Sequence, residues 1–170
     1  MSDRESDVRG VPVQAQLWRN PFRRDSVEAR VLRAWSESPL LQGVRAGVAR
    51  KLVALTHVRH YRAGEFLFRE GEAGVAGALI IHGQVQIQSG GRDLVTLSDG
   101  DFFGEVALLE DAPRTASAVA ATDVQVSFLV RYQLEEFVRH RPRAGLDIMN
   151  NLARLLAGRL HQINSQITQP

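Results

Sequence analysis

The feature that most constrains the fold is a change in hydrophobic period along the chain. Between residues 58 and 130 apolar side chains tend to alternate with polar ones, whereas on both sides they recur every three or four residues. Alternation is typical of half-buried strands, and the longer period is typical of amphipathic helices. The sequence therefore predicts a β region flanked by N-terminal and C-terminal helices.

Glycines divide the β region into short pieces. The clearest strands are Gln84–Gln88 and Val124–Val130, and the turn Ser89–Arg92 predicts a hairpin. Many short strands separated by glycine turns favour a mainly β fold, a barrel or jelly roll, over a sheet crossed by helices. The glycines of this region are Gly64, Gly71, Gly74, Gly77, Gly83, Gly90, Gly91, Gly100 and Gly104.

The N-terminal part divides at residue 25. Residues 1–24 mix charges and prolines without a steady period, which indicates a flexible arm. Residues 25–57 predict helices, the first capped by Asp25 with Glu28 reaching back, and ended near Pro39. A second helical stretch has the apolar face Val44, Val48, Leu52 and Leu55.

The C-terminal part, residues 131–170, predicts a short helix with Leu134 and Phe137, and then a long helix opened by Pro142. Packing on the β region and pairing with a second copy would both hide the apolar seam of the long helix, so a homodimer through this helix is one prediction. A close approach of two backbones would explain Gly158 within it. The seam consists of Met149, Leu152, Leu156, Leu160, Ile163 and Ile167.

Composition narrows the class of protein. With 170 residues, 44% hydrophobic and 24% charged, the chain suits one packed domain. The absence of cysteine excludes disulfides, thiolate metal sites and cysteine nucleophiles. No run approaches the roughly 20 apolar residues of a membrane span, and the start is charged, so we expect a cytoplasmic protein without membrane contact.

Catalysis and metal binding are not predicted. The five histidines form no HxH pair and do not cluster with carboxylates, so no metal site is expected. Ser117 and Ser127 lack the partners of a nucleophile, and Glu105 with Glu110 is too isolated for glycosidase chemistry. We expect no catalytic residues and no enzyme.

Charge is distributed unevenly although the net charge is only +2. Residues 1–60 carry 11 basic and 6 acidic side chains, residues 61–140 carry 6 and 12, and residues 141–170 carry 4 and 1. A basic head and tail would suit an acidic partner, which makes a nucleic-acid-binding accessory protein one alternative. Arginines on solvated helix faces explain the same pattern, and we favour that interpretation.

One segment interrupts the alternation, and we call residues 100–116 the cassette. Gly104 can adopt backbone angles closed to other residues, and Glu105–Leu109 allows about one helical turn before Pro113. The first amides of such a turn lack partners within the helix and attract an anion, phosphate above all. Arg114, expected at the start of the next strand, can bring a bidentate positive charge to that anion, and Thr115 can add a hydroxyl.

Glu105 is the unexpected member of the cassette. A carboxylate repels a phosphate unless it binds a neutral donor, such as a ribose hydroxyl, and is balanced by arginine. The set therefore indicates a ligand with both phosphate and sugar. In the alternative interpretation Gly104 only shapes a turn and Arg114 only pairs with Glu105, which would leave a ligand-free interaction module with a degenerate pocket.

Residues 39–165 resemble the cyclic nucleotide-binding domains of the catabolite activator protein, cyclic-nucleotide-dependent kinases and gated channels. The resemblance implies a cyclic nucleotide-binding β jelly roll, or double-stranded β-helix, flanked by helices. The matching motifs are Pro39-Leu-Leu-Gln-Gly43, Ala63-Gly-Glu65, Glu70-Gly-Glu72, Gly83, Phe103-Gly-Glu-Val-Ala-Leu-Leu109 and Pro113-Arg-Thr-Ala116.

The resemblance also implies roles for single residues. Glu105 would hold the ribose 2′-hydroxyl and Arg114 the cyclic phosphate. The last helix of the family contacts the base, for which Gln162 and Asn164 are available, whereas Ile163 departs from the polar pattern. The implied cyclic nucleotide site contains Phe103, Gly104, Glu105, Val106, Ala107, Arg114, Thr115, Ala116 and Asn164.

The resemblance implies that the protein is a cyclic nucleotide sensor. Thr115 leaves the base open between cAMP and cGMP, with cAMP favoured. Regulators of the catabolite activator type continue into a helix-turn-helix, whereas this sequence ends at Pro170. We therefore expect a regulatory protein that signals through an unknown effector protein rather than by binding DNA.

Overall fold

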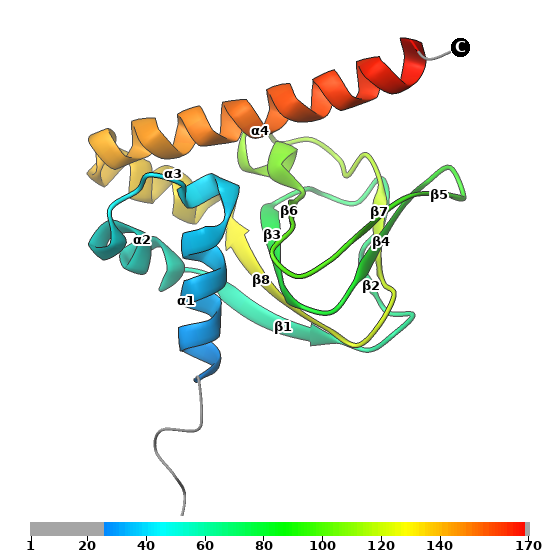
Figure 1. The fold of residues 1–170 in the computed structure, drawn as a ribbon, viewed down its shortest axis with the longest axis horizontal. Helices are drawn as coiled ribbons and strands as arrows, with labels where there is room; N and C mark the ends of the chain where they lie inside the picture. Colours follow the sequence, from blue (N-terminus) through cyan, green and yellow to red (C-terminus); the bar gives the residue numbers. More distant parts are fainter. Residues whose placement is uncertain (1–25, 169–170) are drawn as a thin grey trace, which may run out of the picture.

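The computed structural model describes residues 26–168, apart from the side chains of residues 163 and 166–168. The predicted arm, residues 1–24, and the predicted cap Asp25 lie outside the described residues. Two helices and a short 3₁₀ turn precede the strands, and two helices follow them (Figure 1). The helical elements are α1 (Val27–Glu37), η2 (Pro39–Leu41), α2 (Ala46–Val53), η3 (Glu105–Leu108), α3 (Arg131–His140) and α4 (Pro142–Thr168).

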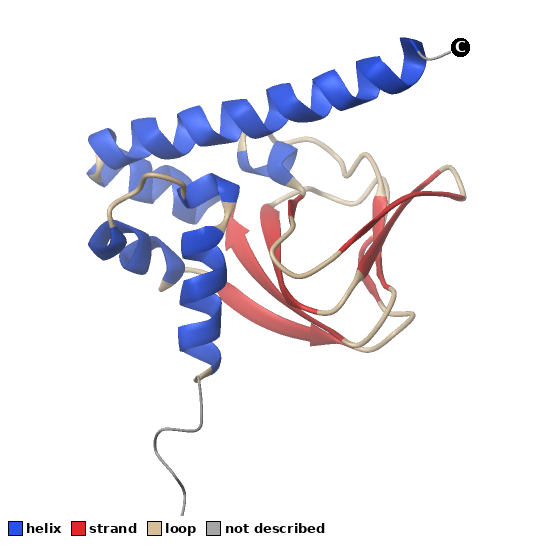
Figure 2. Ribbon diagram, viewed as in Figure 1, coloured by secondary structure: helices blue, strands red, loops and turns tan. Residues whose placement is uncertain are grey.

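Eight strands form two antiparallel four-stranded sheets, ordered β1-β8-β3-β6 and β2-β7-β4-β5. Figure 2 shows α1, α2 and α3 on one side of the strands and α4 running past η3. The predicted jelly roll flanked by helices is confirmed. The strands are β1 (His57–Tyr61), β2 (Phe66–Phe68), β3 (Ala76–His82), β4 (Val85–Ser89), β5 (Arg92–Leu97), β6 (Phe102–Phe103), β7 (Ser117–Ala120) and β8 (Val124–Val130).

Two apolar clusters hold these layers together. One lies between the two sheets and includes Ile80, Val85 and Val126, all fully buried. The other joins the helices to the first sheet, where the Trp35 ring meets the Phe102 ring edge-on at 5.7 Å. The indole Nε1 of Trp35 also donates to Ser127 Oγ at 2.8 Å, so this buried polar pair is satisfied.

Several local predictions are confirmed. Ser89 pairs with Arg92 across the β4–β5 hairpin, and α4 begins at Pro142. The cap of α1 is different, because Ser26 Oγ accepts the Ala29 amide at 3.1 Å. The helix therefore begins one residue later than Asp25 would require, and Ser is an equally good capping residue.

The predicted apolar seam of α4 is covered only in part. Leu152 is fully buried in the cluster below the helix, whereas Leu160 is 59% exposed, so the domain covers an early part of the seam and leaves a later part in water. The side chains of Ile163 and Ile167 lie outside the described residues. Gly158 has open space around the position of its missing Cβ, so no backbone within the described chain approaches it. Among the described residues, no helix is both long and apolar enough to cross a membrane.

Candidate functional site

The cassette turns at Gly104. This residue follows β6 and has φ +70°, in the left-handed region that favours glycine. A Cβ at this position would lie 2.7 Å from Arg114 Nη1, so any other residue would displace the guanidinium. The amide of Ala107 donates to the Gly104 carbonyl at 3.2 Å, which removes it from the amides expected for an anion. The amides of Glu105 and Val106, which precede it, are still expected to bind an anion.

Arg114 is held beside this turn by its backbone and its side chain. Its amide donates to the Glu72 carbonyl at 2.7 Å, and its carbonyl accepts the Gly71 amide at 2.8 Å. Its Nη2 donates to the Ala76 carbonyl at 2.8 Å. The residue lies in the loop before β7 rather than at the start of the strand, because these bonds tie it to the loop between β2 and β3.

The guanidinium of Arg114 lies 3.9 Å from the centre of the Phe68 ring, a cation–π contact that orients its plane. Burial lowers the pKa of Arg114 from its usual value, while the charges of Glu72 and Glu105 oppose that shift. The group therefore remains a cation in a partly desolvated place. Its Nε is buried without a hydrogen-bond partner among the described residues.

Glu105 is 5% exposed at the start of η3. Its Oε1 accepts from Arg159 Nη1 of α4 at 2.5 Å, and Arg159 Nη2 donates to the Phe102 carbonyl at 2.6 Å. Its Oε2 is buried and has no partner within the described part of the chain. The ion pair of Glu105 is thus made by Arg159 and not by Arg114, contrary to the alternative in which the cassette pairs only with itself.

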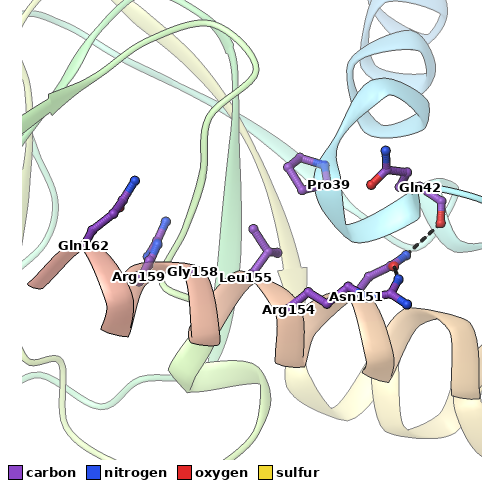
Figure 3. Close-up of a pocket in the computed structure, with 8 residues that line it drawn as sticks. All are labelled: Pro39, Gln42, Asn151, Arg154, Leu155, Gly158, Arg159 and Gln162. Carbon is purple, nitrogen blue, oxygen red and sulfur yellow. Dashed lines mark hydrogen bonds between the residues drawn. The ribbon is translucent and has the colours of Figure 1, made fainter. Parts of the chain in front are cut away.

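Arg159 was missed by sequence reasoning. A buried carboxylate requires a nearby cation, but the sequence offered Arg114 for that role, and the charges of α4 had the pattern of a solvated face. Figure 3 shows Arg159 on the same stretch of α4 as Asn151, Leu155 and Gln162.

The other predicted site residues lie around this centre in different roles. The Phe103 side chain is buried between the sheets, 6.0 Å from the Phe68 ring centre, and contributes to the core. Ala107 is also buried, whereas Thr115 is exposed. Val106 and Ala116 are half-buried, and Asn164 is exposed on α4 beyond Arg159. Contacts of these residues with a nucleotide stay predictions.

An open surface hollow of about 690 Å³ lies beside the site, although none of the predicted site residues lines it. Its lining includes Phe68, whose ring contacts the Arg114 guanidinium. It also includes Glu72, whose charge opposes the lowering of the Arg114 pKa. Pockets of this size accept small organic ligands. No group of three or more His, Asp or Glu side chains gathers as metal ligands in residues 26–168.

Known proteins resemble this chain in sequence and in fold. Residues 58–141 match the family model of the cyclic nucleotide-binding domain. The cyclic AMP receptor protein of Thermus thermophilus is 33% identical over 135 residues, which cover 76% of this chain and 61% of that protein. A cAMP-dependent protein kinase regulatory subunit from Colletotrichum orbiculare is 41% identical over 95 residues, covering 55% of this chain and 24% of the subunit.

The chain belongs to the cyclic nucleotide-binding domain family. The crystal structure of the Thermus thermophilus catabolite activator protein superimposes on 76% of this chain and 62% of its own, with a TM-score of 0.69 and 32% identity. A cyclic nucleotide-binding domain from Methylobacillus flagellatus has the same fold, with a TM-score of 0.73, 22% identity and 82% coverage of both chains. The chain spans between 24% and 61% of the length of the first curated relatives it matches.

Proposed function

We propose that the protein is a cyclic AMP sensor, with Arg114 binding the cyclic phosphate and Glu105 binding the ribose. The relatives support the choice of nucleotide, because they are named as a cyclic AMP receptor protein and as regulatory subunits of cAMP-dependent kinases. The base itself stays a proposal, and cyclic GMP is the competitor to test, because exposed Thr115 is compatible with both nucleotides.

The observation that carries the proposal is a pair of buried polar atoms that have no hydrogen-bond partner within residues 26–168, Glu105 Oε2 and Arg114 Nε. One is an acceptor and the other a donor, and they belong to neighbouring side chains at one turn. A buried polar atom without a hydrogen bond costs about 1–3 kcal/mol. A ligand that supplies a hydroxyl to the carboxylate oxygen and an oxyanion to the guanidinium would remove both costs.

Arg159 supplies the link from ligand to helix. A ribose hydroxyl that donates to Oε2 would leave Oε1 to Arg159, so the carboxylate would hold the nucleotide and α4 together. Tightening of this contact would draw α4 over the base, with Asn164 as a predicted base contact. Leu134 and Phe137, both buried in α3, would repack as the hinge. An effector protein would then recognise the repositioned helix.

Isothermal titration of the purified protein with cAMP and cGMP tests the proposal. We expect saturable binding of cAMP that is at least tenfold tighter than binding of cGMP. Arg114→Gln should weaken cAMP binding by at least a hundredfold, because a charge-assisted hydrogen bond to an oxyanion contributes roughly 1.5–3 kcal/mol and the cation itself is lost. Arg92→Gln, at the exposed β4–β5 turn, removes the same charge and should leave binding unchanged.

Two results would contradict the proposal. Absence of binding by both nucleotides at millimolar concentration would leave the ligand-free interaction module as the better account. Equal weakening by Arg114→Gln and Arg92→Gln would mean that general charge, not the cassette, attracts the nucleotide. Glu105→Gln distinguishes the sugar contact from the phosphate contact. This variant should weaken the binding of cAMP more than it weakens the binding of a 2′-deoxy analogue.

A homodimer through α4 is part of the proposal. Leu146 is 62% exposed and Leu160 is 59% exposed. Met149, Ala153 and Leu156 lie between them at alternating spacings of three and four residues, the pattern of a two-stranded coiled-coil seam. Sedimentation velocity should give a dimer for the native chain and a monomer for Leu160→Glu, whereas a native monomer at high concentration would refute pairing.

A further inference from the structure

A second hollow lies on the other flank of α4, between this helix and η2. We call it the α4 groove. It has a volume of about 390 Å³, within the range of pockets for small organic molecules. Figure 3 shows its wall of α4 side chains facing the loop of Pro39 and Gln42. The lining residues are Pro39, Gln42, Asn151, Arg154, Leu155, Gly158, Arg159 and Gln162.

The α4 groove has a fixed frame. Asn151 is 5% exposed, and its Nδ2 donates to the Leu40 carbonyl at 3.0 Å and to the Gln42 carbonyl at 2.8 Å. These bonds join η2 to α4, so the two walls stay at one separation. Gly158 contributes no side chain, and the space next to its missing Cβ is open. The hollow is therefore formed by the fold before any ligand arrives.

The charge of the groove selects its occupant. Two of its eight lining residues are arginines, three are carboxamides, and none is acidic. Arg154 donates from Nη1 to Asn151 Oδ1, a neutral acceptor, at 3.2 Å. An arginine fork matches carboxylate and phosphate oxygens with two parallel hydrogen bonds. The volume is larger than a bare inorganic ion needs, which favours an organic anion.

The groove is separate from the proposed dimer seam. By the helical period, Arg154 and Gly158 lie on the flank of α4 opposite Leu156 and Leu160. A partner helix on the exposed leucines would leave the groove accessible. Arg159 lines the groove and also belongs to the nucleotide site, because it bonds Glu105 and the Phe102 carbonyl.

We propose that the α4 groove is a second binding site, for a small organic anion with carboxylate or phosphate groups, which competes with Glu105 for Arg159 and so antagonises the nucleotide. The anion engages Arg154 and draws the guanidinium of Arg159 from the cassette. Glu105 then stands buried without its cation and repels the cyclic phosphate. The site requires only the groove, whereas the antagonism rests on the proposed function.

Binding to the groove is tested without nucleotide. Amide chemical shifts of the ¹⁵N-labelled protein are followed during titration with citrate and with glycerol 3-phosphate, at ionic strength held constant with sodium chloride. We expect saturable shifts at Gly158 and Gln162 in at least one titration, and their loss in Arg154→Gln. Arg143→Gln removes a charge from an exposed position of the same helix outside the groove and should keep the response.

Antagonism is tested by titrating cAMP with and without the anion. We expect the Kd for cAMP to rise about fivefold or more at saturating anion, and, by reciprocity, cAMP to weaken the anion equally. Arg154→Gln should abolish the rise while binding cAMP normally. Shifts at Gly158 without cAMP binding would refute the proposed function and retain the site. Absence of saturable shifts with both anions, or shifts that survive Arg154→Gln, would overturn the site, and an unchanged Kd would overturn the antagonism.

Discussion

The two halves of α4 are held by different forces. The first half, up to Leu152, buries Ile148 and Leu152 completely and ties Asn151 to the carbonyls of η2. The second half leaves Leu160 exposed and contacts the cassette through Arg159. Figure 1 shows α4 running past the cassette. Moving a buried apolar side chain out of the core would leave a cavity, which costs free energy. Water, by contrast, can replace a hydrogen bond made by a partly exposed side chain.

The difference indicates where the helix can respond to a ligand. The packed half sets the direction of α4 and cannot move without repacking the helical cluster. The second half is held at the carboxylate that we propose for the ribose, so a change at Glu105 reaches it directly. Substitutions in α4 should therefore separate stability from ligand response.

Leu152→Ala tests the packed half and should have the largest effect on stability. Removing a fully buried leucine side chain costs about 2–5 kcal/mol of the free energy of unfolding. Urea denaturation measures the loss, at low protein concentration to limit pairing. Leu160→Ala on the second half should change stability by less than about 0.5 kcal/mol. Equal losses would mean that the two halves are packed alike.

Arg159→Gln tests the contact of the second half. Because Glu105 would be left buried without its cation, we expect a loss of about 1–3 kcal/mol. This is less than for a fully enclosed pair, since the Arg159 side chain is 38% exposed. Arg154→Gln, one turn away, removes the same charge without touching Glu105 and should be nearly neutral in urea denaturation. A neutral result for Arg159→Gln would show that water replaces this ion pair at no cost.

Asn151→Ala removes the polar tie between α4 and η2. It leaves two carbonyl groups without their donor, and each hydrogen bond contributes about 1 kcal/mol, so a loss of about 2 kcal/mol is expected. The neighbouring Asn150 is exposed, and Asn150→Ala provides the matched control. If both variants unfold at the same urea concentration, the tie contributes nothing to the fixed frame of the groove.

Gly158→Ala should have a small effect of the opposite sign. Apart from the backbone of its own helix, no described atom lies within 4 Å of the added Cβ, so the helix gains roughly 0.5–1 kcal/mol from the better helix former. Gly145→Ala should instead destabilise, because its Cβ would lie 2.6 Å from Val138 Cγ1. Thermal unfolding of the two variants should move in opposite directions, and stabilisation by both would contradict the packing of α3 on α4.

Much of the fold was predictable because it depends on neighbours in the chain. Ser89–Arg92 forms the hairpin and Gly104 adopts positive φ, since glycine alone makes both turns easy. The cap was misplaced by one residue because Asp25 and Ser26 are both good capping residues, so composition could not choose between them. The apolar seam of α4 was predicted from its spacing, but the spacing does not show that Leu152 is buried and Leu160 exposed, because docking on the rest of the fold decides which part is covered.

The candidate site divides in the same way. Glu105 and Arg114 were predicted as its charged members, because a glycine turn, an acid and an arginine occur close together in the sequence. Arg159 was not predicted, since 54 residues separate it from its carboxylate. Local backbone preference reaches only a few residues along a chain, so the β region, its clearest strands and turns, and the cassette could be predicted from the sequence. The packing of distant elements decides which cation pairs with a buried carboxylate and which part of a helix stays in water. Only the tertiary structure therefore determined these two features.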